Sequence, residues 1–148
     1  MNVLKINQEV LKDMLGTKRT SFSYCEGDRL YIQVDPEVGY FLAEEQMLVN
    51  LEGAQQAYPY DPEEVVAPKN LLVGTDEYRI GGTIRKCLHQ NGTAVYIQTD
   101  LLKYFDAPVL YHAEGSPVVV TEDAKDRWSI VGMVAEYVMK QEEEHGQT

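Results

Sequence analysis

Cysteine and long apolar runs are both scarce in this chain of 148 residues. Cys25 and Cys87 are its only cysteines, too few for the disulfide framework on which many small secreted domains depend. We expect both to be buried thiols. No apolar run approaches the roughly 18 residues that span a bilayer, and the N-terminus lacks the apolar core of a signal peptide. The sequence predicts a cytoplasmic protein with no membrane contact.

Positive charge is scarce as well. The chain has 13 Lys and Arg against 24 Asp and Glu, which gives a formal net charge of -11. Such a protein repels the phosphate backbone as a whole, so nucleic-acid binding would need a local basic patch. Lys18 and Arg19, in GTKRT, form a small basic spot, although solvated loop charges explain them more simply. The composition therefore disfavours a nucleic-acid partner.

Catalytic signatures are missing too: the sequence has no GxSxG, P-loop or HExxH motif. One set of residues offers the ligands that zinc prefers, namely Cys25, Cys87, His89 and His112. Their spacing matches no zinc signature. We therefore predict a protein without catalytic, cofactor-binding or metal-binding residues. A small enzyme or metal-binding protein using these four residues is the alternative.

What the chain does contain is an apparent repetition. VLKINQEVLKDM at residues 3–14 aligns with AVYIQTDLLKYF at 94–105, with a constant offset of 91 residues. SFSYCEGDRLYIQVD at 21–35 then aligns with VLYHAEGSPVVVTED at 109–123, with an offset of 88. In this alignment Glu26-Gly27 matches Glu114-Gly115. Two similar units without common ancestry are the alternative, but the repeated order of elements favours duplication.

Each copy predicts the same elements. A short apolar strand, at 3–6 or 94–97, leads into a short helix whose apolar residues recur on one face. Asn7 stands where an N-cap is expected. Three strands follow, because apolar and polar residues alternate and a Glu-Gly turn separates the first two. The predicted fold is α+β, with two βαβββ units, two short helices, mostly antiparallel sheets and pseudo-twofold symmetry.

We expect a single domain over residues 1–140, with the first repeat at 2–50 and a connection at 51–77. A hairpin and the second repeat occupy 78–140, and residues 141–148 form an acidic tail. Asn91-Gly92 is a strong hairpin signal, and Gly81-Gly82 suggests a bulge within a strand.

The connection contains two tyrosines beside acidic residues, Tyr58 and Tyr60. Exposed tyrosines supply a large contact area at little entropic cost, so these two are candidate contacts for a protein partner. The alternative is that their rings hold the connection against the sheet.

Two βαβββ units fused head to tail resemble one domain of the DNA polymerase sliding clamps. AVYIQTDLLKYF looks like the strand that enters the last helix of a clamp, and GSPVVVTED with RWSIVGMVAEYV looks like the strands that close its last domain. The resemblance implies sheets on the outside of a ring and helices lining its hole. This chain departs from it by holding a single such domain, and by offsetting Lys12 and Lys103 with neighbouring acids.

These observations predict a non-catalytic accessory module that binds a protein partner or assembles with itself. The main alternative is a processivity-type DNA clamp subunit that assembles from single-domain protomers.

Overall fold

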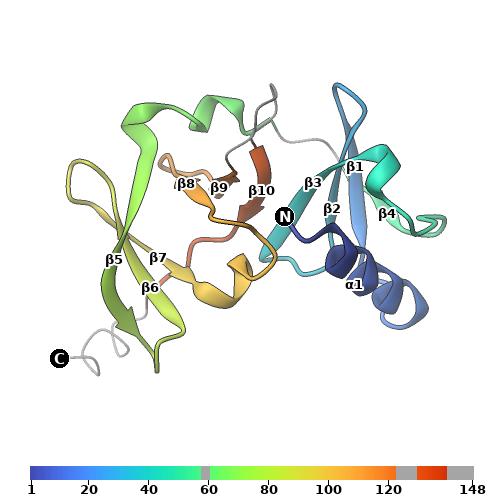
Figure 1. The fold of residues 1–148 in the computed structure, drawn as a ribbon, viewed down its shortest axis with the longest axis horizontal. Helices are drawn as coiled ribbons and strands as arrows, with labels where there is room; N and C mark the ends of the chain where they lie inside the picture. The colour runs from blue at the N-terminus through green and yellow to red at the C-terminus, as the bar shows by residue number, and fades with distance from the viewer. Residues whose placement is uncertain (58–60, 123–129, 140–148) are drawn as a thin grey trace.

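The computed structural model describes residues 1–57, 61–122 and 130–139. It is an α+β structure with one α-helix, α1 (Val3–Leu15), and a mixed sheet of 10 strands (Figure 1). The strands are β1 (Ser21–Cys25), β2 (Arg29–Gln33), β3 (Val38–Ala43), β4 (Gln55–Gln56), β5 (Leu71–Arg79), β6 (Ile84–Leu88), β7 (Ala94–Gln98), β8 (Val109–Tyr111), β9 (Val118–Thr121) and β10 (Ile130–Val134). Four short 3-10 helices are η1 (Glu44–Gln46), η2 (Glu63–Val65), η3 (Pro68–Asn70) and η4 (Thr99–Leu102). No helix within these ranges is long and apolar enough to cross a membrane.

Helix α1 begins earlier than the sequence predicted. The side chain of Asn2 accepts a hydrogen bond of 3.1 Å from the backbone N–H of Lys5, which caps the helix at its first turn. Ile6 and Val10 are fully buried on one helix face. The predicted strand at 3–6 is therefore wrong: its apolar residues also fit helical spacing, and burial of that face decides between the two patterns.

Asn7 lies inside α1 rather than at its N-cap, which corrects a second prediction. Its side-chain nitrogen donates to the carbonyls of Val3, at 3.0 Å, and Gln46, at 2.9 Å. Its side-chain oxygen accepts a bond of 2.7 Å from the N–H of Leu48. A buried side-chain amide needs such partners, and these bonds tie the segment after η1 to the helix.

The second predicted unit begins differently from the first. The expected strand at 94–97 is confirmed as part of β7. The expected helix around Leu101 is the 3-10 helix η4, followed directly by a turn through Lys103. The structure therefore has one α-helix where two short helices were predicted. The first unit lacks the leading strand that the second has.

The order of the sheet is β4-β1-β2-β3-β10-β9-β8-β5-β6-β7. Only β4 runs parallel to its neighbour, β1. Two antiparallel meanders, β1-β2-β3 and β8-β9-β10, meet where β3 pairs with β10. Ser21 pairs with Gln33 in the first meander and Val109 with Thr121 in the second. Both members of the second pair lie 88 residues after their counterparts, which is the offset found in the sequence.

The third strands of the two meanders also correspond. Ile32 pairs with Tyr40, and Val120, which lies 88 residues after Ile32, pairs with Gly132. Tyr40 and Gly132 are thus counterparts, and they pair directly with each other across the β3–β10 junction. The pairing pattern thus matches on either side of this pair, although Gly132 lies 92 residues after Tyr40 rather than 88.

The turns agree with the sequence at Asn91-Gly92 and at both Glu-Gly pairs, residues 26–27 and 114–115, and differ in one place. Asn91-Gly92 joins β6 to β7, and Gly92 adopts a φ of 86°. The Glu26-Gly27 turn joins β1 to β2. Gly81-Gly82 is the turn between β5 and β6 instead of a bulge. The bulge lies in β5, between Gly74 and Tyr78, within the range predicted as connection.

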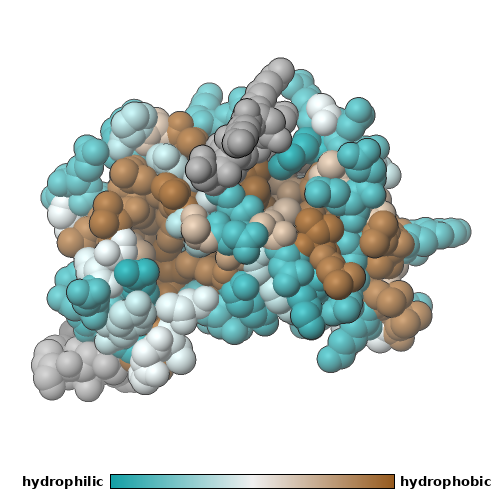
Figure 2. Space-filling model, viewed as in Figure 1, coloured by the Kyte–Doolittle hydropathy of each residue, from teal (hydrophilic) through white to brown (hydrophobic). Residues whose placement is uncertain are grey.

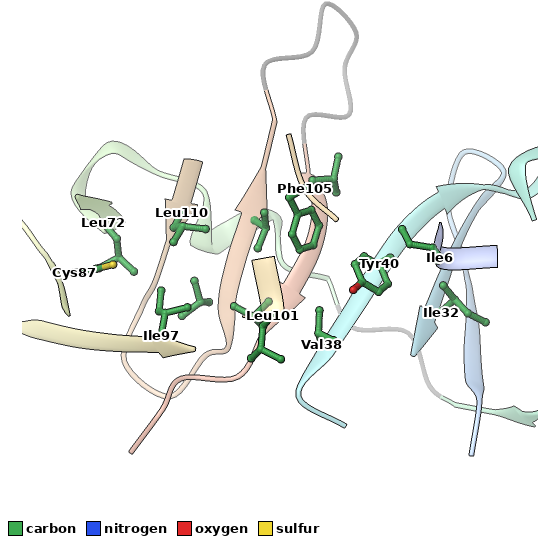
Figure 3. Packing of buried hydrophobic residues seen from close by; sticks show 14 of the residues in the cluster. Ile6, Ile32, Val38, Tyr40, Leu72, Cys87, Ile97, Leu101, Phe105 and Leu110 are labelled. Atoms are coloured by element: carbon green, nitrogen blue, oxygen red, sulfur yellow. The ribbon is translucent and has the colours of Figure 1, made fainter. Parts of the chain in front are cut away.

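The core extends through both halves of the sheet (Figure 3). Ile6 and Tyr40 belong to the same buried cluster as Ile97, Leu101 and Phe105. A smaller cluster covers the other face of the central strands, where its members are Phe41, Val65, Val119, Ile130 and Met133. Strands β3, β9 and β10 are therefore buried on both faces, which explains their nearly continuous apolar sequences.

Candidate functional site

An apolar groove lies between the β5-β6-β7 strands and the chain from η4 to β8. Its volume is about 510 Å³. Figure 2 shows apolar side chains gathered in this hollow, over the side of the molecule that Figure 1 labels β5 to β8. Val73, Tyr78 and Val109 line the groove and are 60%, 48% and 41% exposed. Apolar side chains left open to water in a concave site are typical of a binding surface.

One wall of the groove is a face of the β5-β6-β7 strands. Gly74 pairs with Cys87, and Tyr78 pairs with Arg85, across the β5–β6 ladder. Arg85 pairs in turn with Ile97 of β7. Directly paired residues of antiparallel strands have their side chains on the same face. All five residues therefore face the groove, and each of them lines it.

Arg85 supplies the positive charge of this wall. Its Nε donates a 2.9 Å hydrogen bond to the carbonyl of Thr75, and its guanidinium carbon lies 5.6 Å from the centre of the Tyr78 ring. A Cβ atom added to Gly74 would lie 2.5 Å from that carbon. Glycine at position 74 thus leaves the space in which the guanidinium crosses β5.

No carboxylate of the described residues lies within ion-pairing distance of Arg85. The neighbouring cation on the opposite face, Lys86, has one, because its Nζ lies 3.3 Å from Glu77 Oε2. Arg85 is therefore available to an anionic group that enters the groove.

A second apolar surface runs along the outside of α1. Leu4, Leu11 and Leu15 are 62%, 47% and 79% exposed. They occupy positions i, i+7 and i+11 of the helix, which places them on one face. Figure 2 also shows exposed apolar side chains over α1.

The predicted basic spot, Lys18 and Arg19, lies in the loop after α1 and is exposed. The loop is organised by the carboxylate of Asp13, which accepts bonds of 2.6 Å from Thr17 Oγ1 and 2.7 Å from the N–H of Thr20. Arg19 contributes its N–H at 3.1 Å, and its Nε lies 4.0 Å from the same carboxylate. Part of the charge of this spot is therefore neutralised by Asp13.

These bonds also determine the acidity of Asp13. Burial alone would raise the pKa of its carboxyl, but the hydrogen bonds from Thr17 and Thr20 and from the backbone of Arg19 outweigh burial and hold the pKa at about 2.

Two of the four residues considered as metal ligands come together. His89 Nε2 lies 3.0 Å from His112 Nδ1, and His112 Nε2 lies 3.2 Å from Glu136 Oε2. The three side chains connect the end of β6, the end of β8 and the segment after β10. Burial and the adjacent His112 lower the pKa of His89, against the opposing effect of Glu136. The geometry is that of a proton-sharing chain.

The two cysteines belong to different parts of the core. Cys87 lies in the larger cluster, and Cys25 packs against the smaller one. Both are free thiols, and burial raises the pKa of each. Across the described ranges, no group of three or more His, Cys, Asp or Glu residues is placed to hold a metal ion. Tyr58 and Tyr60 lie outside the described residues.

The groove was missed in the sequence because its residues come from β5, β6, β7, η4 and β8 and share no local motif. Gly74 is the available signal, since a glycine between apolar strand residues often marks a close approach by another group. No family model, curated protein or solved structure matches this chain.

Proposed function

We propose that this chain is a non-catalytic protein-binding module that holds an apolar segment of its partner in the groove beside β5. The observation that carries the proposal is the open apolar groove of about 510 Å³, with Val73, Tyr78 and Val109 exposed at its rim. A net charge of -11 accompanies it. A protein this acidic suits a protein partner better than a nucleic acid.

We further propose that the module is a duplicated, clamp-like domain. The shared offset of 88 residues in the two meanders supports duplication, and so does the pairing of Tyr40 with its counterpart Gly132. Contact between α1 and the chain after η4 supports a clamp-like arrangement, because Asn2 N–H donates a 2.7 Å bond to the Tyr104 carbonyl. This bond joins the N-terminal end of α1 to the chain that follows η4.

The alternative function is a DNA clamp subunit assembled from single-domain protomers. The bond between Asn2 and Tyr104 is consistent with this function too. The exposed leucines of α1 weigh against it, since a surface facing DNA needs cations to neutralise phosphates. Leu4, Leu11 and Leu15 occupy that face, and Lys12 shares it.

The test uses peptides selected from a random displayed library on the wild-type chain. Affinities of the selected peptides are then measured for Leu102→Asp, which places a charge inside the groove, and for Leu15→Asp, the same change on exposed α1. We expect at least about a tenfold loss for the first variant, because a buried unpaired charge is costly, and little change for the second.

Three outcomes would contradict this proposal. If no peptide is selected, the groove is not a binding site. If Leu15→Asp abolishes binding while Leu102→Asp does not, the docking surface is α1. If the chain forms a closed ring by light scattering and is retained on duplex DNA in a salt-dependent way, the clamp alternative is correct.

A further inference from the structure

We infer that the partner segment binds in an extended conformation and adds a strand to the open edge of β5, with an acidic side chain directed to Arg85. This inference rests on the proposed function, because it specifies what occupies the same groove. Three features support it: the direction of the backbone groups of β5, the shape of the groove face, and the charge of Arg85, which no carboxylate of the described residues pairs.

The edge of β5 that faces β8 is paired only at its beginning. Leu71 and Leu72 pair with β8, and no strand of the described chain continues on that edge beyond Leu72. From Val73 onward β5 pairs with β6 on its other edge. The groove lies where β5 and β8 separate, so an incoming segment would meet an unpaired strand edge.

Hydrogen bonds already present show which backbone groups point to that edge. His112 N–H donates to Asn70 O at 2.9 Å, so the carbonyl of residue 70 faces β8, as the N–H of Leu72 then must. In an antiparallel ladder the N–H and C=O of one residue point to one edge, and those of the next residue point to the other. By this alternation Leu72 and Gly74 also face the β8 side.

The β6 side of the ladder gives the same result. His89 N–H donates to Thr93 O at 2.9 Å, so the backbone groups of His89 and Cys87 face β7 and those of Leu88 face β5. Leu88 is paired with Val73. Val73 therefore bonds to β6, and Gly74 points away from it toward the groove.

Beyond the bulge, a bond to Thr99 shows which edge each residue's backbone groups face. The N–H of Thr99 donates to Thr83 O at 2.9 Å. Thr83 and Arg85 thus face β7, and Ile84 faces β5 and bonds to Arg79. Tyr78, the residue before Arg79, points to the open edge. Gly74 and Tyr78 consequently offer their N–H and C=O groups beside the groove.

An extended segment is the occupant that fits these groups. A helix satisfies its own backbone and has no free N–H or C=O along its length, whereas a strand can exchange bonds with Gly74 and Tyr78. Alternate side chains of an added strand would enter the groove, which is apolar at Ile97, Leu102 and Leu110. The partner segment should therefore alternate apolar and polar residues.

Arg85 adds a charge requirement to this pattern. Its guanidinium lies over Gly74 on the groove face, and no described carboxylate is within ion-pairing distance of it. A carboxylate on the added strand would complete a charge-assisted pair in partly buried surroundings. We expect one acidic residue among the side chains that face the groove.

Peptides from the selection above provide the test. Each is remade with N-methyl groups on alternate backbone nitrogens, in both phases, which removes strand hydrogen bonds and keeps every side chain. We expect one phase to weaken binding about tenfold or more and the other to weaken it much less. Equal tolerance of both phases would overturn strand addition, while the binding of the parent peptides would leave the proposed function intact.

Amide hydrogen exchange supplies an independent readout. Bound peptide should slow the exchange of the Gly74 and Tyr78 N–H groups, whereas those of Val73 and Arg79, already bonded to β6, serve as internal controls. Unchanged exchange at Gly74 and Tyr78 in the saturated complex would contradict the inference.

The charge requirement is tested by Arg85→Gln, with Lys86→Gln as its matched control on the opposite face of β6. We expect about a tenfold loss of peptide affinity for the first variant and little for the second. If selected peptides lack acidic residues and bind Arg85→Gln normally, the assignment of Arg85 is wrong.

Discussion

Tyr104 and Glu9 are joined across 95 residues of sequence: the tyrosine hydroxyl donates a 2.6 Å hydrogen bond to Glu9 Oε1. Lys103 Nζ also lies 3.9 Å from the same oxygen. Glu9 belongs to α1, and Tyr104 follows η4, so this bond connects α1 to the chain after η4. The bond to Glu9, more than burial, raises the pKa of Tyr104 to about 12.

The contribution of this bond to stability can be measured. We expect Tyr104→Phe to lower the free energy of unfolding by about 1 kcal/mol, because a partly exposed hydrogen bond to a carboxylate is lost. Glu9→Gln should move the pKa of Tyr104 back toward 10, as read by NMR of labelled tyrosine rings. A double-mutant cycle on denaturant unfolding isolates the pair. Additive effects of the two changes would show that the residues do not interact.

Gly132 is required where the two meanders meet. A Cβ at this position would lie 2.5 Å from Phe105 Cζ and 2.6 Å from the carbonyl oxygen of Gly39. We expect Gly132→Ala to destabilise the protein by about 1–3 kcal/mol, since neither strand can move apart without loss of pairing. Adding Phe105→Leu should recover little, because the backbone contact remains. Thermal unfolding of the single and double variants measures both effects, and full recovery would assign the strain to the ring alone.

Asp13 is expected to make the free energy of unfolding depend on pH in the acidic range. Its folded pKa of about 2 is below the ordinary value of 3.8, so its ionised form is favoured by folding. That contribution is present above about pH 4 and is lost as the pH falls toward 2. Asp13→Asn should cost about 2 kcal/mol near neutral pH, because bonds to Thr17 and Thr20 lose their charge.

Urea unfolding at several acidic pH values provides the measurement for Asp13. The difference between wild type and Asp13→Asn should shrink as the pH falls. Asp76→Asn, a change at an exposed acid on the bulge of β5, is the matched control and should show neither effect. A constant difference across that pH range would contradict the assigned role.

His89 should add a second pH dependence, in a higher range. Its pKa is lowered from 6.5, so the folded state disfavours the charged form. Stability associated with neutral His89 is therefore present above about pH 6.5 and is lost as the pH falls through the lower folded value. The ring of His89 has little room for solvation of a charge on this side, because its Nε2 lies 3.0 Å from His112 Nδ1.

The measurement for His89 is the free energy of unfolding between about pH 7 and pH 5. We expect the wild type to lose stability over this interval and His89→Gln to lose less. NMR of the imidazole rings should show His89 titrating below its ordinary value. If the free energy of unfolding changes equally with pH in both proteins, His89 does not cause the loss of stability.

Local sequence signals predicted the hairpins because their turn chemistry is intrinsic. Asn91-Gly92 and Glu26-Gly27 supply residues that accept positive φ, and the structure has turns at both. The prediction placed a strand where α1 begins. Over so short a run, Val3 and Ile6 fit the apolar spacing of a strand as well as that of a helix. The segment is helical because Ile6 and Val10 are buried on one helix face and Asn2 caps the first turn.

The sequence predicted the first two strands of each meander and their 88-residue offset, because alternation and turn residues act over neighbouring positions. The third strands do not keep that offset, since Tyr40 and Gly132 are 92 residues apart. Only the tertiary structure decided where β5 separates from β8, and hence that Gly74, Tyr78 and Arg85 border one groove. A strand edge is open only where no other strand pairs with it. Which strands pair depends on residues far apart in the chain, so local sequence patterns cannot show where β5 is left unpaired.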